Sequence, residues 1–346
     1  MSKKFLSLLA LVCVSIVLAG CAQQVTENDE EEKINVMVSI LPQVSFVEAI
    51  GGDQVAVNEM IPPGFSPATY EPSPDQLKKL HNADLYFRIG HIPFEKAQIE
   101  RISTINRDMQ IIDTSVGISL RHLEAHTHHD DEEGHEEGDE HEHEEEHGHE
   151  HEDEHAHAEE DEHGHAEEHA HEHEEEHEDE HEHDAGGDPH IWLAPQLVKI
   201  QAQHIYDALV AEAPEHEDYF AANYESFITE LDALDQTLSE TFAPVQGKTI
   251  FVFHPAFGYL ADAYGFTQEA IEFQGKDPSP QHLESIIEQA RAEDVQVIFV
   301  QKQFSTKSAT AIASELGGAV VQIDPLAKDY FANLEALAET IVSNIQ

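Results

Sequence analysis

Four side chains that commonly bind metal ions occupy positions where a folded chain would expose them. His91, His254 and Asp324 each come directly after an apolar, β-branched run that predicts a strand. His190 lies in Asp188-Pro189-His190, where ordered sequence resumes after a long polar segment. Ligands of open α/β folds bind outside the carboxyl ends of the strands, so these side chains could converge there. Two or three imidazoles with one carboxylate form a site suited to zinc.

Each candidate ligand also has a simpler interpretation. His190 or His254 could cap a helix or lie in the core, and Asp324, which precedes a proline, could be a turn residue. Shared placement at strand ends favours the metal site over these alternatives. Cys13 and Cys21 are the two cysteines of the chain, and Cys13 lies within an apparent secretion signal, so a zinc–thiolate site is not expected.

A second group of possible ligands fills a single polar segment, residues 121–187. Between His126 and Asp188 the chain has 19 of its 27 histidines and 32 of its 71 acidic residues, without Lys or Arg. Such a composition cannot bury enough apolar surface to offset the entropy of ordering, so we predict disorder. Clustered histidines with acidic neighbours favour several weak, exchanging metal sites. We interpret the segment as an accessory metal collector, because a flexible tract defines no selective geometry.

The elements that must position the four candidates alternate between strand and helix along the chain. The predicted strands are 34–40, 55–61, 84–89, 109–113, 249–253, 267–273, 295–300 and 319–323. The predicted helices are 43–50, 74–82, 93–102, 195–210, 215–242, 257–264, 280–292, 306–316 and 333–345. This alternation indicates βαβ units and parallel sheets. We therefore predict an α/β fold with two lobes, each a parallel sheet flanked by helices, joined by the long helix 215–242.

The sequence also predicts how the chain is divided into segments and which class of partner is excluded. The segments are a signal peptide (1–20), a lipid tether (21–33), an N-terminal lobe (34–120), the insertion (121–187), the end of the N-terminal lobe (188–213), a linker helix (214–244) and a C-terminal lobe (245–346). The formal net charge of −54 argues against nucleic acid, whose phosphates need cationic partners, and is compatible with attraction of cations.

The N-terminus predicts export and a lipid anchor. Lys3 and Lys4 precede the apolar run 5–19, which is shorter than the roughly 20 residues of a spanning helix. The following Leu-Ala-Gly-Cys resembles the lipobox of secreted lipoproteins, which implies cleavage before Cys21 and acylation of its sulfur. An uncleaved anchor helix with an incidental cysteine is the alternative. Either way the protein is expected outside the cytoplasm, in the periplasm or on the outer face of the membrane.

Three stretches resemble the ZnuA/TroA-like family of metal-binding lipoproteins, which serve ABC importers of zinc and manganese. They are 62–74, which contains Tyr-Glu-Pro-Ser-Pro, 188–195 with Asp-Pro-His-Ile-Trp-Leu-Ala-Pro, and 252–259 with Val-Phe-His-Pro-Ala-Phe-Gly-Tyr. The resemblance implies two lobes with a rigid connecting helix, a metal ion in the cleft, and a permease and ATPase as partners of a monomeric carrier. By motif, His190 and His254 match two metal histidines and Asp324 matches the carboxylate ligand. A histidine at position 254 favours zinc, because manganese-type members tend to have Glu there.

One position departs from the family pattern. The family's first histidine follows a proline before Tyr-Glu-Pro, but this chain has Ala68 there. Three explanations stay open: His91 supplies the missing ligand, which we prefer, Glu71 reaches the metal, or a water completes a three-ligand site.

Other functions compete with zinc import. A carrier of manganese, nickel or another divalent metal would use similar ligands, and a surface lipoprotein could buffer metal or mediate adhesion without meeting a transporter. A zinc hydrolase needs an open coordination position and a general base. We expect no enzyme, since none of the predicted helices contains His-Glu-x-x-His.

Overall fold

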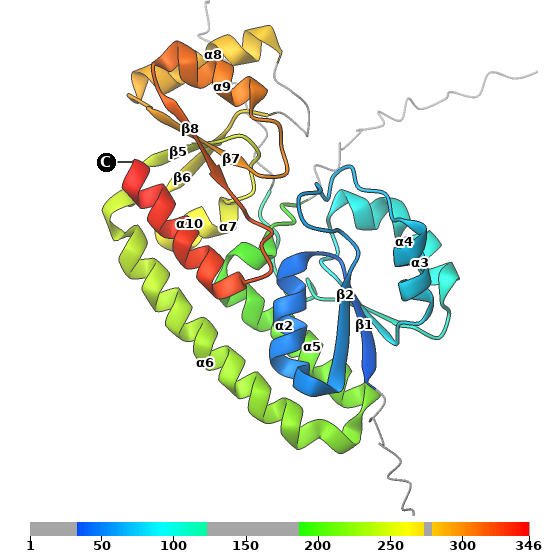
Figure 1. Ribbon diagram of the computed structural model, residues 1–346. Helices are drawn as coiled ribbons and strands as arrows, with labels where there is room; N and C mark the ends of the chain where they lie inside the picture. Colours follow the sequence, from blue (N-terminus) through cyan, green and yellow to red (C-terminus); the bar gives the residue numbers. More distant parts are fainter. Residues whose placement is uncertain (1–32, 123–186, 273–278, 346) are drawn as a thin grey trace, which may run out of the picture. The chain divides into compact units, whose positions relative to one another are not determined.

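The computed structural model describes residues 33–122, 187–272 and 279–345 (Figure 1). The predicted signal peptide, the lipidation site at Cys21, nearly all of the tether and nearly all of the polar insertion lie outside the described residues. The fold below therefore concerns the segments that flank the insertion.

The first lobe is built on a parallel sheet in the order β2-β1-β3-β4. Its strands are β1 (Ile34–Val38), β2 (Val55–Glu59), β3 (Leu85–Arg88) and β4 (Gln110–Asp113). The helices of this lobe are α2 (Leu41–Gly51), α3 (Pro74–His81), α4 (Pro93–Ile105) and α5 (Pro195–Glu212). Because α5 follows the insertion in the chain, the first lobe is completed by residues from both sides of it (Figure 1).

The second lobe repeats the arrangement, with a parallel sheet in the order β6-β5-β7-β8. The strands are β5 (Thr249–Val252), β6 (Thr267–Ala270), β7 (Val297–Gln301) and β8 (Ala319–Ile323). Its helices are α7 (Gly258–Tyr264), α8 (Pro280–Ala292), α9 (Lys307–Leu316) and α10 (Tyr330–Asn344). The predicted α/β fold with two parallel sheets flanked by helices is confirmed.

The long helix α6 (Glu217–Phe242) contacts elements of both lobes (Figure 1). Its 26 residues extend roughly 40 Å at 1.5 Å per residue. Phe227 packs against Phe46 of α2, with ring centroids 5.8 Å apart, and Phe242 stacks on Tyr264 of α7 at 5.3 Å. Aromatic contacts near the middle and at the C-terminal end of one helix explain how a connecting segment also belongs to the core of each lobe.

The central strands β5 and β7 of the second sheet are apolar on both faces because helices cover both faces. In the second sheet Val252 and Phe299 face the main core, whereas Phe251 and Val300 face a smaller core beneath α8 and α9. This explains why these two strands are nearly continuous apolar runs and do not alternate with polar residues.

Element ends differ from the predictions by a few residues. The predicted strand 34–40 ends at Val38, and Ser39 N donates both to Phe87 O of β3 and to Gln43 Oε1 in the first turn of α2. The predicted long helix begins at Glu217, after a 3-10 turn over Pro214–His216. The last helix begins at Tyr330 instead of residue 333.

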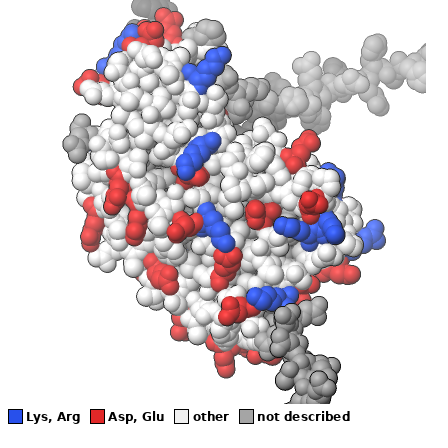
Figure 2. All heavy atoms as spheres, in the orientation of Figure 1, with Lys and Arg blue, Asp and Glu red and all other residues white. Residues whose placement is uncertain are grey.

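Acidic and basic side chains are interspersed over the face drawn in Figure 2, where red Asp and Glu side chains lie beside blue Lys and Arg. None of the described helices is both long and apolar enough to cross a membrane.

Candidate metal centre

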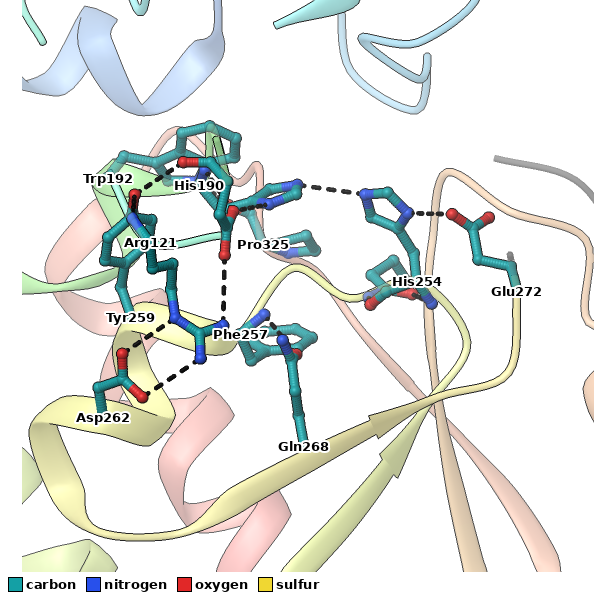
Figure 3. A network of polar contacts seen from close by, with 12 residues as sticks. Arg121, His190, Trp192, His254, Phe257, Tyr259, Asp262, Gln268, Glu272 and Pro325 are labelled. Carbon is teal, nitrogen blue, oxygen red and sulfur yellow. Dashed lines mark hydrogen bonds and ion pairs between the residues drawn. The ribbon is translucent and has the colours of Figure 1, made fainter. Parts of the chain in front are cut away.

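Two of the four predicted ligands meet in the structure. His190 lies directly before a 3-10 turn (Ile191–Leu193), and His254 lies two residues after the end of β5. Their Nε2 atoms are 3.2 Å apart, and the ring centroids are separated by 5.0 Å with the planes at 73° (Figure 3). The two histidines are 64 residues apart in the chain, so the fold and not the local sequence brings them together.

A carboxylate holds the other ring nitrogen of each histidine. Asp188 Oδ1 lies 2.7 Å from His190 Nδ1, and Glu272 Oε1 lies 2.5 Å from His254 Nδ1 (Figure 3). A carboxylate accepts hydrogen bonds, so each Nδ1 carries the proton and donates it. Both Nε2 atoms then present lone pairs to the same point. Metal-binding histidines in proteins have this carboxylate–imidazole arrangement, which fixes the tautomer and the direction of the ligand.

His254 is fixed by contacts to its backbone and its ring. The buried Gln301, the last residue of β7, accepts a hydrogen bond from His254 N at 3.2 Å and donates one to His254 O at 2.6 Å. The ring of Phe304 stacks on the imidazole at 4.9 Å. Burial lowers the pKa of His254, against the opposing effect of its hydrogen bond to Glu272. A lowered pKa keeps the imidazole neutral, which is the form that binds a metal ion.

His190 is held by its own segment and by the second lobe. Asp188 is fully buried, and its Oδ1 also accepts a hydrogen bond from His190 N at 3.0 Å. The indole of Trp192 lies 5.2 Å from the imidazole ring and donates its Nε1–H to Pro325 O at 2.8 Å. The segment that bears His190 is thus attached to the loop after β8.

The structure does not join Asp324 to this pair. Its Oδ1 accepts hydrogen bonds from Leu326 N at 3.0 Å and from Gln303 Nε2 at 2.9 Å, and its Oδ2 lies 3.5 Å from Lys302 Nζ. The contact with Leu326 N, two residues on, is the turn geometry that an Asp before a proline favours. In this structure Asp324 therefore has the contacts of a turn residue.

His91 lies in the short loop between β3 and α4, half-buried and outside the pair. Gly90 precedes it with φ of 96°, and an added Cβ there would collide with the side chains of Asp113 and Ser115, so the loop requires glycine. Glu95, fully buried in the first turn of α4, accepts hydrogen bonds from Ile89 N at 2.7 Å and Gly90 N at 2.6 Å.

The loop that contains Ala68 is attached to the start of the same helix. Pro67 O accepts a hydrogen bond from Phe94 N at 3.1 Å, and the Tyr70 ring lies 6.1 Å from that of Phe94. Residue 68 and residue 91 therefore belong to neighbouring loops of one lobe.

Within the described ranges, His, Cys, Asp and Glu side chains form no group of three or more arranged to hold a metal ion. The sequence predicted His190 and His254 as ligands but not the two carboxylates that contact their Nδ1 atoms. Asp188 lies two residues before His190, and Glu272 comes just after β6, the neighbour of β5 in the sheet. The predicted strand 267–273 contains Glu272, so the strand-end rule passed over it, whereas the observed strand ends at Ala270.

Comparison with known proteins shows the family to which the chain belongs. The sequence profile of the family described as "Zinc-uptake complex component A periplasmic" (ZnuA) matches residues 36–344. The chain belongs to the ZnuA family. Its relative in Bacillus subtilis, the "High-affinity zinc uptake system protein ZnuA", is 26% identical over 322 residues, which cover 92% of this chain and 87% of that protein.

Two solved ZnuA structures are similar to this ZnuA-family chain. A crystal structure of ZnuA has 32% identity and a TM-score of 0.71, with 90% of this chain and 99% of that chain covered. The structure of a ZnuA deletion variant, 138–173, with zinc bound has the same identity and TM-score. The match covers 90% of this chain and 98% of that chain. The predicted family resemblance is confirmed.

Proposed function

We propose that this protein captures a zinc ion outside the cytoplasm and passes it to the permease and ATPase of an ABC importer. His190 and His254 are the first two ligands of the ion, which is the cargo of the protein and not a resident cofactor. The membership in the ZnuA family supports this assignment. The protein acts as a carrier without catalytic turnover.

One observation carries the proposal, the approach of the two Nε2 atoms to 3.2 Å with both Nδ1 atoms engaged by carboxylates. Two nitrogens bound tetrahedrally to one zinc at 2.0–2.1 Å are about 3.3 Å apart. The pair therefore has the separation of two ligands on the same ion. Without a cation or a proton between them, two lone pairs would face each other.

We propose that His91 and Asp324 complete the ligand set. The connection between the Ala68 loop and the start of α4 supports His91, because both loops project from the same part of the first lobe. Asp324 adjoins Pro325, whose carbonyl accepts the hydrogen bond from Trp192 beside His190. Both residues must move to reach the pair, and Asp324 must exchange its contacts with Gln303 and Lys302 for the ion.

Replacing His91 with alanine tests this fourth ligand. If His91 binds the ion, His91→Ala is expected to weaken zinc binding at least as much as loss of an outer-sphere partner does, about 10–100-fold. Competition titration against a chromophoric chelator measures the change. His81→Ala is the matched control, since His81 is exposed and its Nδ1 contacts Ile105 O at the end of α4. An unchanged affinity would leave Glu71 or a water as the remaining ligand.

Deleting the polar insertion tests the proposed site as a whole. Asp188 N donates a hydrogen bond to Arg121 O at 2.8 Å, so the two flanking ends are close enough for a short glycine-rich turn to replace residues 124–185. We expect the shortened protein to bind one zinc ion tightly and to lose the additional weak binding that we ascribe to the insertion. Loss of all tight binding would contradict the proposal and make the protein a metal-collecting surface lipoprotein.

We further propose that Cys21 carries the lipid anchor that keeps the monomeric carrier beside its permease, with residues 21–33 as tether. The Leu-Ala-Gly-Cys sequence supports this anchor. The alternation of strands and helices on both sides of the polar segment supports the division of the chain into two lobes, an insertion and a linker helix. Membrane fractionation of the Cys21→Ser variant tests the anchor. A variant that stays with the membrane would indicate an uncleaved anchor helix.

A further inference from the structure

Arg121 lies beside the candidate metal centre but takes no part in the ligand set. Its guanidinium binds Asp262 of α7 through Nε at 2.9 Å and Nη2 at 3.3 Å (Figure 3). Its Nη1 lies 3.7 Å from Asp188 Oδ2, which is an ion-pair distance. The Arg121 side chain is 18% exposed, the Asp262 side chain is 60% exposed and the Asp188 side chain is 1% exposed. Arg121 therefore links an exposed carboxylate to a buried one.

The Asp188 carboxylate lies between Arg121 and the metal histidine. Its Oδ1 receives the hydrogen bond from His190 Nδ1, whereas its Oδ2 faces the guanidinium. A buried carboxylate is costly unless a cation offsets its loss of hydration. Arg121 supplies that cation at the oxygen that the histidine does not use, and so favours the orientation in which Oδ1 points to His190.

The backbone of both residues is fixed by a third side chain. Tyr259 OH accepts a hydrogen bond from Arg121 N at 3.1 Å and donates one to Asp188 O at 2.8 Å. Asp188 N donates to Arg121 O at 2.8 Å. Arg121 is the first residue of the segment 121–187 and Asp188 directly follows its last, so these contacts join both ends of the segment to Tyr259 of α7.

Gly258, the first residue of α7, leaves the space that the pair needs. A Cβ at this position would lie 2.6 Å from Arg121 Cζ and 2.8 Å from Asp188 Oδ2. Both distances are too short for any side chain, so the ion pair depends on glycine here. The Phe-Gly-Tyr sequence after His254 thus provides both the space and the hydroxyl that hold Arg121 and Asp188.

We propose that Arg121 is a positioning residue of the zinc site, acting through Asp188 on the direction of the His190 imidazole. This proposal rests on the proposed function, because it presumes that His190 and His254 bind the ion. Arg121 holds the buried carboxylate, the carboxylate holds Nδ1–H, and the opposite nitrogen then faces His254. Removing the guanidinium releases the first of these constraints while every ligand stays in the chain.

Zinc titration of Arg121→Gln in the full-length protein tests the inference. We expect binding to weaken about tenfold, at the lower end of the range for outer-sphere partners of a metal ligand. The visible absorption spectrum of the cobalt(II)-loaded protein, which depends on ligand geometry, should also change. Arg121→Lys keeps the charge near Asp188 and should recover part of the affinity.

A matched control separates this effect from the loss of an ion pair in general. Lys199 pairs with Asp232 between α5 and α6, with side-chain exposures of 22% and 61% that resemble those of Arg121 and Asp262. Lys199→Gln is expected to leave zinc affinity and the cobalt spectrum unchanged. An Arg121→Gln protein with the affinity and spectrum of the wild type would overturn the inference.

Two further measurements keep the test decisive. If Arg121→Gln does not fold, Asp262→Asn removes the exposed partner alone and should weaken binding by a smaller factor with the same spectral change, and an unchanged Asp262→Asn would then overturn the inference. Wild-type protein that binds zinc no more tightly than His254→Ala would refute the proposed function itself. The two failures are therefore distinguishable.

Discussion

Replacing either His190 or His254 with alanine is expected to weaken zinc binding by more than about 100-fold, beyond the 10–100-fold range of outer-sphere changes. Each imidazole presents its Nε2 lone pair to the same point, 3.2 Å from the other nitrogen. Because the two act on one ion, their effects should not add, and the double variant is expected to bind little more weakly than either single one. Competition titration at fixed pH and salt measures all three affinities.

The control for these variants is His204→Ala on α5. His204 Nε2 contacts Val116 O at 2.8 Å, so the control also loses a histidine with a backbone contact, but one outside the pair. Thermal unfolding without metal should show that the variants are folded. Wild-type affinity in His254→Ala would place the tight site elsewhere in the chain and refute the proposed centre.

The second large effect concerns the stability of the first lobe and its dependence on pH. Burial raises the pKa of Glu95 from 4.5 to about 7, although hydrogen bonds from Ser39, Ile89 and Gly90 lower it. A carboxyl group with a raised folded pKa stabilises the fold fully below its unfolded pKa. That contribution is lost as the pH rises from the unfolded pKa through the folded pKa of about 7. The difference between the two pKa values corresponds to about 3 kcal/mol of unfolding free energy.

Urea unfolding of wild type and Glu95→Gln with chelator present measures this contribution. Between about pH 5.5 and pH 8 the unfolding free energy of the wild type should fall by about 2 kcal/mol relative to that of Glu95→Gln, since the amide does not titrate. The amide loses one acceptor for Gly90 N, but that cost is the same at both pH values. Glu100→Gln, an exposed position on the same helix, should retain the wild-type pH dependence. Parallel curves for wild type and Glu95→Gln would contradict the expectation.

Much of the fold could be predicted because its elements are signalled locally. Proline and glycine mark the limits of several helices: α8 begins at Pro280, and α9 ends just before Gly317. Buried parallel strands appear as apolar runs such as 249–252, since helices cover both faces. The exact ends could not be predicted, because they depend on contacts such as Gln43 Oε1 with Ser39 N.

The candidate site could be predicted only in part. The rule that ligands follow parallel strands selected His254, which meets His190, but it also selected His91 and Asp324, which lie outside that pair in the described residues. Asp324 instead accepts hydrogen bonds from Leu326 N and Gln303. The position of a residue at a strand end fixes where its backbone lies. The direction of its side chain depends on the hydrogen-bond partners around it, which the sequence does not show.

The sequence by itself determined the kinds of group available to this protein: imidazoles and carboxylates without a cysteine site, alternating strands and helices, and motifs of the ZnuA family. These are properties of residue type and of short-range order, which the chain carries whether or not it is folded. Tertiary structure alone decided that His190 meets His254, that Glu272 and Asp188 set their tautomers, and that Arg121 adjoins Asp188. These contacts join residues 18 to 67 positions apart, except within Asp188-Pro189-His190, and only the packing of parallel strands and helices brings such distant groups within hydrogen-bond or ion-pair distance.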